Sequence, residues 1–492
     1  MKKIEVIIGK TWYFIVWLFL CIAIAIFALK PHVPEMVIIL GIVVLLFIHF
    51  GTKQCSSINE NYIKIKIWIA TFISRYSFCC FINDKIQQQN DFAITLEEAN
   101  SGIFVDRLDY YRQWVHKMIY PLLLHKFGFN TQPKIFLVQS IIVAFVAVMI
   151  YIIASKIVNN RMAFYASCLY VLWPGQLFYS AIITEEHVAA LVVCFLIIGS
   201  LKMYDLLEEG FSTKKEMYQY ILLVISLGIL FGMSEFFKDW GSVILVAIVI
   251  SGVWIIVHVS NKKRLFFLIG LLTIIVFKSI IANLVINYCE NRLGGVSVGN
   301  NVVISQMYGT LDPNSTGEYN GEGNEEYLNI VKKYNYDFDA ANKEALSILK
   351  NKIVQDIDKM PALLYRKGTT AYVDDASMLY WVFVVSNISE ENYSYYRAII
   401  QILWYLSALY YIFMAISLMI GMSFKTSNKK FYIGLIILGS ILVSLIIESH
   451  GRYKYSIEPL WCIVACQIFD SDLHDKFVFG LRNICNRLKV RI

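Results

Sequence analysis

The sequence predicts an all-α polytopic membrane protein, and three observations lead to that class. Of its 492 residues, 58% are hydrophobic and only 16% are charged, whereas a soluble domain carries about 25% charged residues. Many apolar runs approach the roughly 20 residues that a helix needs to cross the hydrocarbon core. Lys and Arg gather in short loops between these runs, as in the cytoplasmic loops of helical membrane proteins. A β-barrel would instead show short segments of alternating hydrophobicity.

We expect about 12 transmembrane helices, with both chain termini on the cytoplasmic side. The N-terminal segment carries Lys2, Lys3 and Lys10, and the loop at 214–215 is equally basic. Placing such loops in the cytoplasm sets the direction of every span. In chain order, the predicted spans are residues 12–29, 34–50, 64–82, 133–155, 163–181, 188–203, 217–237, 241–259, 265–286, 397–422, 430–448 and 456–469.

Two predicted elements depart from a plain apolar helix. The span at 163–181 contains a Trp-Pro-Gly sequence at 173–175, and neighbouring helices must satisfy the kink that this proline creates. The polar segment 287–395 contains apolar residues at helical spacing, which predict an amphipathic helix that can lie on the membrane surface. These residues are Leu346, Leu349, Ile353 and Ile357.

The predicted spans divide the chain into three parts. Residues 1–286 form a transmembrane module whose first extracytoplasmic loop is 83–132. Residues 287–395 form a larger extracytoplasmic segment with amphipathic helices. Residues 396–492 contain the last transmembrane helices and a basic cytoplasmic tail.

Charge and cysteine content exclude other classes. The net charge of +7 does not indicate nucleic-acid binding, because helical membrane proteins collect Lys and Arg in cytoplasmic loops. The ten cysteines lack metal-type spacing and lie mostly in apolar runs, so we interpret them as small apolar helix residues. The first apolar run has no small-residue cleavage site, and we expect it to remain as an anchor.

Asp91 is the first candidate for chemistry. It lies in the loop 83–132, directly before Phe92 and a helix-like ITLEEAN stretch. A loop carboxylate is often merely solvated. One that is held near the membrane surface could instead remove a proton from an acceptor hydroxyl, and such general-base catalysis contributes roughly 10²–10⁴ in rate.

Further titratable residues gather at predicted outer boundaries. Glu185, Glu186 and His187 begin the sixth span. Because a charge in hydrocarbon costs roughly 2.5–3.5 kcal/mol on insertion scales, we expect these groups among lipid headgroups or facing a polar cavity. Lys238 is a cation on the predicted outer side, although it could simply pair with Asp239.

The last predicted outer turn, residues 450–454, is dense in polar groups. Arg452 can bind phosphate oxygens through a bidentate fork, and Gly451 lets the backbone approach a ligand. The alternative is an arginine that merely extends to the membrane interface. An anionic ligand would explain the few cations of the predicted outer turns, which are Lys30, Lys238, Arg452 and Lys454.

Several motifs follow one another in order and on one predicted side of the membrane. They are Asp91-Phe92, Tyr120-Pro121-Leu-Leu-Leu, Phe127-Gly128, Trp173-Pro174, Thr184-Glu185 and Arg452-Tyr453 before Pro459. In this order the chain resembles the GT-C superfamily of membrane glycosyltransferases. It is most similar to the protein O-mannosyltransferase and aminoarabinose-transferase-like branch, families 39 and 83. The resemblance covers residues 80–290 and 360–470.

The resemblance implies that residues 1–286 are a catalytic module. Such enzymes transfer a sugar from a polyprenyl-phosphate donor to a hydroxyl acceptor on the extracytoplasmic face, usually with inversion. Asp91 would be the general base, and Glu185 the second catalytic candidate, shaping the acceptor or donor pocket. The predicted residues that bind donor phosphate or substrate are His116, Tyr120, Glu186, His187, Lys238, His450, Arg452 and Tyr453.

The chain departs from the family in its acidic motifs. Phe92 follows Asp91 where relatives have a second acidic residue, and the site has no Asp-x-Asp metal motif. Asp374 and Asp375 are adjacent, which is poor metal spacing. We therefore predict no metal ligands, no obligatory metal and no cofactor besides the donor lipid. The phosphate leaving group would depend on cations for its developing charge.

The predicted partners are the polyprenyl-phosphate sugar, membrane lipid, and an acceptor that is an envelope glycan, a lipid or a protein. Richness in Ile, Lys and Asn suggests an AT-rich bacterium and its plasma membrane. The alternatives are a polysaccharide polymerase or ligase, a transporter or flippase of lipid-linked sugar, and a non-catalytic scaffold. Transporters often show internal repeats and polar groups near the midplane, whereas here polar residues gather at the outer boundary.

Overall fold

The computed structural model describes residues 60–84, 86–258, 260–298, 302–373, 375–382, 390–423 and 427–469. Throughout these ranges the chain forms helices joined by turns and loops, without a strand. The predicted all-α class is therefore confirmed. The first two predicted spans, the predicted tail, Lys30 and Asp374 lie outside the described residues.

Seven described helices are long and apolar enough to cross a membrane. They are α3 (Glu60–Ile82), α7 (Gln132–Ile157), α10 (Glu186–Glu209), α11 (Lys214–Ser234), α13 (Asn261–Arg292), the part of α19 (Glu390–Ser423) from Leu403 onward, and α20 (Asn428–Ile446). Two shorter apolar stretches complete the bundle, residues Trp240–Val253 of α12 (Trp240–His258) and α21 (Glu458–Ala465), which continues into η5 (Cys466–Phe469). Helix α8 (Asn160–Leu172) packs against α7 and α21. The chain is thus a multi-pass α-helical membrane protein, while the number of 12 spans stays a prediction.

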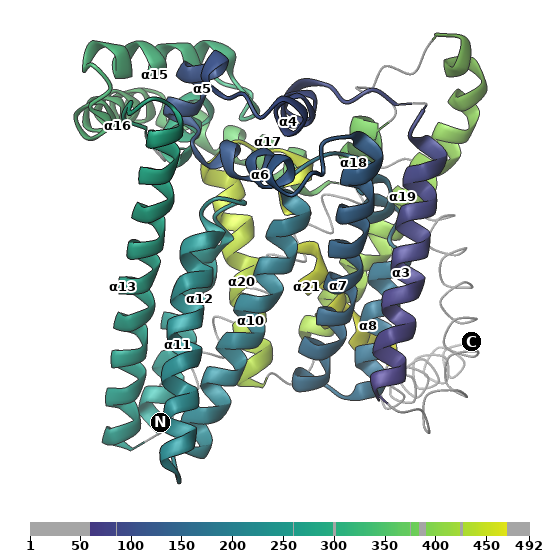
Figure 1. Ribbon diagram of the computed structural model, residues 1–492, viewed down its shortest axis with the longest axis vertical. Coiled ribbons are helices and arrows are strands. Elements are labelled where there is room, and N and C mark those ends of the chain that lie inside the picture. Colours follow the sequence, from purple (N-terminus) through teal and green to yellow (C-terminus); the bar gives the residue numbers. More distant parts are fainter. Residues whose placement is uncertain are drawn as a thin grey trace, which may run out of the picture.

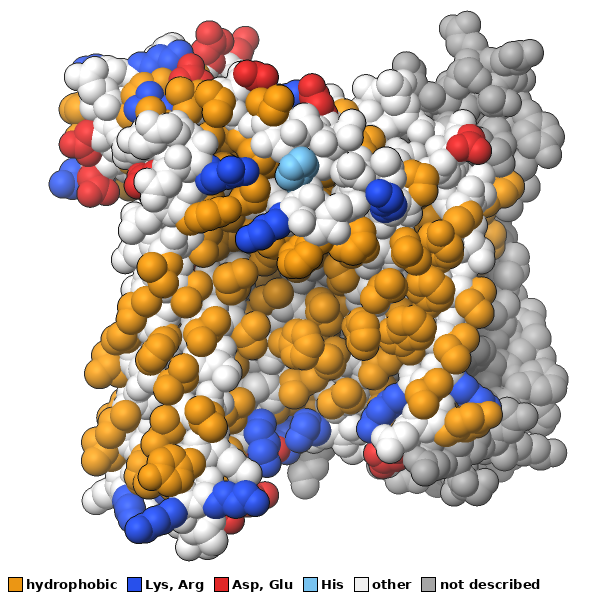
Figure 2. All heavy atoms as spheres, in the orientation of Figure 1, with side chains coloured by type: hydrophobic (Ala, Val, Ile, Leu, Met, Phe, Trp, Pro, Cys, Tyr) orange, Lys and Arg blue, Asp and Glu red, His pale blue; other side chains and the backbone are white. Residues whose placement is uncertain are grey.

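An apolar band crosses the face of the bundle that Figure 2 shows. On α13, leucines with more than half of their surface exposed face outward, as expected where a helix meets lipid. They are Leu265, Leu268, Leu272 and Leu284. Lys and Arg side chains gather at the lower end of the view, which we call the basic end. The opposite end carries helices from residues 90–126 and 302–380, and we call it the capped end.

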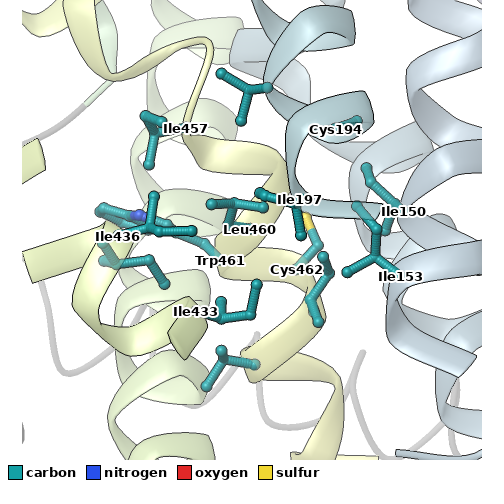
Figure 3. Close-up of a cluster of buried hydrophobic side chains, with 14 of the residues drawn as sticks. Ile150, Ile153, Cys194, Ile197, Ile433, Ile436, Ile457, Leu460, Trp461 and Cys462 are labelled. Atoms are coloured by element: carbon teal, nitrogen blue, oxygen red, sulfur yellow. The ribbon is translucent and has the colours of Figure 1, made fainter. Parts of the chain in front are cut away.

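The short helix α21 lies among the long helices (Figure 3). Its residues Leu460, Trp461 and Cys462 are almost completely buried. They pack among apolar side chains of α7, α10 and α20, namely Ile150, Ile153, Cys194, Ile197, Ile433 and Ile436. On the side of α19, a Cβ atom at Gly421 would collide with the Val464 carbonyl. This packing holds in place the turn that precedes α21 and carries Arg452.

The predicted proline break is present, and a neighbouring helix satisfies it. α8 ends at Leu172, and α9 (Pro174–Tyr179) continues after it. A proline leaves the carbonyl four residues earlier without its helical partner. Here Arg75 of α3 donates from Nη2 to the carbonyls of Tyr170 at 3.0 Å and Val171 at 3.3 Å. The break was predictable from the sequence, whereas the role of Arg75 was not.

Short helices cover the capped end (Figure 1). They are α4 (Asn90–Ser101), η1 (Val105–Arg107), α5 (Leu108–Gln113), α6 (His116–Lys126), α14 (Val302–Thr310), α15 (Gly321–Lys333), α16 (Phe338–Gln355), η2 (Ile357–Lys359), α17 (Met360–Tyr372), α18 (Ala376–Tyr380) and η4 (Gly451–Lys454). Helices α14, α15 and α16 form a lobe with a small apolar core that includes Tyr327, Val331 and Leu349.

The predicted amphipathic helix corresponds to α16, but the prediction made it too long. The helix ends at Gln355 because Asp356 leaves the helical conformation, with φ −119° and ψ 36°. Ile357 therefore lies in the following turn and is 60% exposed, whereas Leu349 is buried in the lobe.

Candidate active site

Asp91 lies at the capped end, in the first turn of α4. Asn90 has a left-handed φ of 51°, which asparagine tolerates better than most residues. Phe92 is buried, and its ring meets the edge of the Trp381 ring at 5.2 Å. The Asp91 side chain itself is 39% exposed. Phe92 is thus anchored in the protein, while the neighbouring Asp91 carboxylate stays accessible to solvent. Its position at a helix N-terminus favours negative charge.

Lys117, on α6, connects two of the predicted residues. Its Nζ lies 2.8 Å from Glu185 Oε1 and 3.9 Å from Asp91 Oδ2. Burial alone would lower the pKa of Lys117, but the two carboxylates more than offset it and raise that pKa. Burial would raise the pKa of Glu185, yet Lys117 and Lys238 hold it below its usual value. Lys117 was not among the residues predicted from the sequence, although a cation directly after His116 on the predicted outer side was a usable signal.

The titratable groups at the start of α10 are buried in the protein, which differs from the headgroup interpretation. Glu186 Oε1 lies 3.0 Å from Lys238 Nζ, and the Tyr179 hydroxyl donates to the other carboxylate oxygen. His187 Nδ1 lies 2.8 Å from the Tyr455 hydroxyl. These partners compensate charges and polar atoms that would otherwise be costly to bury.

Lys238 turns toward Glu186 and not toward Asp239. Its Nζ also lies 3.9 Å from the centroid of the Tyr453 ring, within cation–π range. Asp239 instead accepts hydrogen bonds from the backbone N–H and the hydroxyl of Ser242. The expected Lys238–Asp239 alternative is therefore wrong. Lys238 has a φ of 121°, a strained conformation that costs about 1–3 kcal/mol and persists where the surroundings enforce it.

Arg452 brings the C-terminal part of the chain to Asp91. It lies in η4, and one of its Nη atoms is 3.7 Å from Asp91 Oδ2. The guanidinium lies over the rings of Phe92 and Trp381, at 5.2 and 5.0 Å from their centroids. Its buried Nε has no hydrogen-bond partner among the described residues. An anionic ligand could accept a hydrogen bond from this unused donor.

Two of the three predicted histidines, His116 and His450, are held in the neutral form. Burial, followed by the charge of Arg452, lowers the pKa of His450 to about 3. Burial, followed by the charge of Lys117, likewise lowers the pKa of His116 to about 3. The His450 ring lies 5.7 Å from the Tyr453 ring. Both imidazoles therefore contribute neutral polar groups and do not add positive charge to the site.

Two predicted residues do not join the cluster. Tyr120 is buried on α6, and its hydroxyl makes no hydrogen bond within the described part of the chain. Lys454 is buried, and its Nζ donates to the Ala371 carbonyl at 3.0 Å. Proximity in sequence to Lys117 and Arg452 is thus not enough to place a side chain at Asp91.

The structure therefore gathers three acidic and three basic side chains at the capped end. We call this set the polar cluster: Asp91, Lys117, Glu185, Glu186, Lys238 and Arg452. Equal numbers of opposite charges make their joint burial tolerable. The two contacts to Asp91 are longer than hydrogen bonds, so these cations can turn to another anion. The cluster can bind a phosphate and offers an accessible carboxylate as a proton acceptor.

No protein family model matches the chain, and no curated protein is similar to it in sequence. Among the described residues, no three His, Cys, Asp or Glu side chains come together as a metal site, and metal independence stays a prediction.

Proposed function

We propose that the protein is a GT-C-type glycosyltransferase of a bacterial plasma membrane. It moves a sugar from a polyprenyl-phosphate donor to a hydroxyl acceptor on the extracytoplasmic face. The meeting of Asp91 with Arg452 and Lys117 at the capped end carries the proposal. A carboxylate beside cations, where an apolar bundle meets water, suits a lipid-linked phosphate and a hydrated acceptor. The basic end then faces the cytoplasm.

The donor phosphate is held by the cations of the polar cluster. Arg452 has an unused Nε donor and can form bidentate hydrogen bonds to phosphate oxygens. Negative charge on the phosphate grows as the sugar–phosphate bond breaks, so Arg452, Lys117 and Lys238 bind the transition state more tightly than the ground state. Loss of one such donor typically lowers the rate about 10²–10³-fold.

Asp91 takes the proton of the acceptor. The acceptor oxygen attacks the anomeric carbon opposite the phosphate, its O–H proton passes to Asp91, and the carbon–phosphate-oxygen bond breaks. The bonding electrons leave with polyprenyl phosphate, and a single displacement inverts the anomeric carbon. When the donor phosphate draws Arg452 and Lys117 to itself, their long contacts to Asp91 Oδ2 loosen and free this carboxylate. Glu185 keeps Lys117 in place through the shorter ion pair.

The test uses full-length protein in lipid nanodiscs and polyprenyl-phosphate donors that carry different radiolabelled sugars. We expect sugar transfer that Asp91→Asn lowers by about 10²–10⁴-fold, with unchanged membrane insertion. Asp106→Asn is the matched control, because Asp106 is an exposed carboxylate of the same loop. Full turnover in Asp91→Asn would refute the base assignment. A metal chelator in the same assay tests metal independence.

The same assay separates the other functions. Transfer from a polyprenyl-diphosphate oligosaccharide would indicate a polymerase or ligase. Passage of labelled lipid across the bilayer without sugar release would indicate a transporter. Absence of both sugar transfer and lipid passage would indicate a non-catalytic scaffold. The position of the polar cluster at one end of the bundle favours the transferase, because transporters bind substrate near the midplane.

A further inference from the structure

Lys367, on α17, is a buried lysine that the proposed transfer step does not use. Its side chain is fully buried, and its Nζ donates to three backbone carbonyls, those of Ile447 at 2.6 Å, Gly317 at 3.2 Å and Thr310 at 3.4 Å. Burial lowers the pKa of Lys367 to about 8, although the charge of Glu448 opposes this shift. The ammonium group is therefore mostly protonated at pH 7 and can donate to all three carbonyls.

The hydrogen bond to the Ile447 carbonyl depends most on Lys367. Within the described residues, this carbonyl accepts a hydrogen bond from no other group. It directly follows α20, at a helix end whose carbonyls lack helical partners. The Gly317 carbonyl, by contrast, also accepts from the Ser449 N–H at 3.0 Å. Loss of the Lys367 ammonium would therefore free Ile447 first.

One side of α17 holds the turn that carries Arg452 at both of its ends. We call the segment from Ile447 to Lys454 the arginine turn. Lys367 Nζ binds the carbonyl of its first residue, and the last residue donates from its own Nζ to the Ala371 carbonyl at 3.0 Å. Lys367 and Ala371 are four residues apart, so they lie on the same side of the helix. Arg452 is thus placed between two anchored ends.

Hydrogen bonds inside the arginine turn make it move as a unit. The Arg452 N–H donates to His450 Nδ1 at 3.3 Å, and the Tyr453 N–H donates to the His450 carbonyl at 3.0 Å. The Arg452 carbonyl accepts from the Tyr455 N–H at 3.1 Å. A displacement of the anchored ends therefore displaces the Arg452 side chain as well.

Gly317 fits closely against the side chain of Lys367. Its φ is 84°, a conformation that glycine adopts more readily than other residues. A Cβ atom at this position would collide with Cγ of Lys367. Gly317→Ala therefore displaces the lysine side chain without removing its charge, and it offers a second way to disturb the same anchor.

We propose that Lys367 is a positioning residue for the donor phosphate. By holding the carbonyl of Ile447, it keeps the arginine turn where the Arg452 guanidinium lies beside Asp91. A misplacement of about 1 Å can lower the rate of an enzyme about 10²-fold, so this anchor matters although it is remote from the transferred sugar. The role in donor binding rests on the proposed function, whereas the anchoring of the turn does not.

Hydrogen–deuterium exchange tests the anchoring without any ligand. The full-length wild type in nanodiscs is compared with Lys367→Met, which removes the ammonium group, and with Gly317→Ala. We expect faster exchange of the arginine turn in both variants, because local opening becomes easier when anchoring bonds are lost. Arg366→Ala is the control, since this exposed neighbour donates to the Ser315 carbonyl, outside the turn. Exchange at the wild-type rate in both variants would overturn the anchoring.

A double-mutant cycle tests whether Lys367 acts through Arg452. The readout is the Kd of a short-chain polyprenyl phosphate, measured by native mass spectrometry. We expect this Kd to rise at least about threefold in Lys367→Met and about tenfold or more in Arg452→Ala. The double variant should bind as Arg452→Ala does, because the binding group that Lys367 positions is then absent. Effects that multiply, or an unchanged Kd in Lys367→Met, would overturn the proposal.

Gly317→Ala takes the place of Lys367→Met in the cycle if Lys367→Met does not fold. The same outcomes are expected, because Gly317→Ala disturbs the same anchor and leaves the charge of Lys367 in place. A lower Tm with wild-type affinity for polyprenyl phosphate would show a purely structural role and would overturn the proposal.

The radiolabelled transfer assay separates this proposal from the proposed function. We expect a higher donor KM and an unchanged acceptor KM in Lys367→Met. Sugar transfer with an unchanged donor KM in that variant would overturn the positioning role and leave the proposed function intact. Coupled effects of Lys367 and Arg452 on polyprenyl phosphate binding, in a protein that transfers no sugar, would support the positioning role and refute the proposed function. Absence of binding to the wild type would overturn both.

Discussion

Two ion pairs in this protein have the same length but different surroundings. Lys117 Nζ and Glu185 Oε1 are 2.8 Å apart, as are Lys333 Nζ and Glu344 Oε2 on the lobe. The side chains of the first pair are 18% and 7% exposed, and those of the second are 61% and 26% exposed. Water screens the second pair, whereas the first must balance its charges within the protein. The Lys117–Glu185 pair is therefore distinguished by its burial and by its position beside the accessible Asp91 carboxylate, and not by the distance between its charged atoms.

Replacement of Lys117 by Met should have the largest effect. It leaves Glu185 buried without its partner, which costs about 3–5 kcal/mol, and it removes a cation from the donor site. Thermal unfolding followed by tryptophan fluorescence should show a lower Tm, and sugar transfer should be lost.

The double variant Lys117→Met/Glu185→Leu separates the two effects. It removes both charges, so most of the lost stability should return, while transfer should stay absent. A single Lys117→Met variant with the Tm of the wild type would contradict the view that burial makes this pair different from the pair on the lobe.

Replacement of Arg452 by Ala should weaken donor binding. Hydrogen bonds to charged groups contribute about 1.5–3 kcal/mol, so the donor KM should rise roughly tenfold or more, with little change in the acceptor KM. Arg366→Ala is the control, since Arg366 is exposed and donates to the Ser315 carbonyl away from the polar cluster. An unchanged donor KM in Arg452→Ala would count against the phosphate-binding role.

Acidification should destabilise the region of the polar cluster through its neutral histidines. In the unfolded chain a histidine binds a proton below about pH 6.5, whereas His116 and His450 in the folded protein have pKa values of about 3. The unfolded state binds more protons between these values, so the free energy of unfolding falls as the pH decreases below about 6.5. The slope of Tm against pH should be smaller in His116→Gln, and an unchanged slope would contradict this assignment.

Replacement of Lys333 by Met should have the smallest effect. Lys333 and Glu344 form an exposed pair on the lobe, and such pairs contribute little because water screens them. Neither the Tm nor the rate of sugar transfer should change measurably in the assays used for Lys117→Met. A large decrease in the Tm or in the rate of sugar transfer would show that the difference in exposure does not explain the different contributions of the two ion pairs.

Local features of the fold followed from the sequence. The apolar runs correspond to helices such as α7, α10 and α11, and the Pro174 break lies where it was predicted. Hydrophobicity and the missing N–H of proline act within a few residues, so a linear pattern reveals them. The end of α16 was predicted less accurately, because the apolar spacing continues to Ile357 although the helix stops at Gln355.

The candidate site was only partly predictable. Asp91 and Arg452 were recognisable as an acidic and a basic residue outside the apolar runs, because charge is costly in hydrocarbon. Lys117 was missed, and Lys238 was given Asp239 as its alternative partner. The structure pairs Lys238 with Glu186 instead. Adjacency in the chain is a poor guide to ion pairs, since the nearest carboxylate in space can belong to another helix.

The sequence by itself determined that this chain forms many apolar helices and that its charged residues lie mainly at their ends, because burying charge in hydrocarbon is costly for each residue separately. Only the tertiary structure decided that α4, α6 and the turn before α21 meet, and that Asp91 lies beside both Lys117 and Arg452. That meeting depends on how the helices pack around α21. Packing is a property of side chains distant in sequence, and no local pattern contains it.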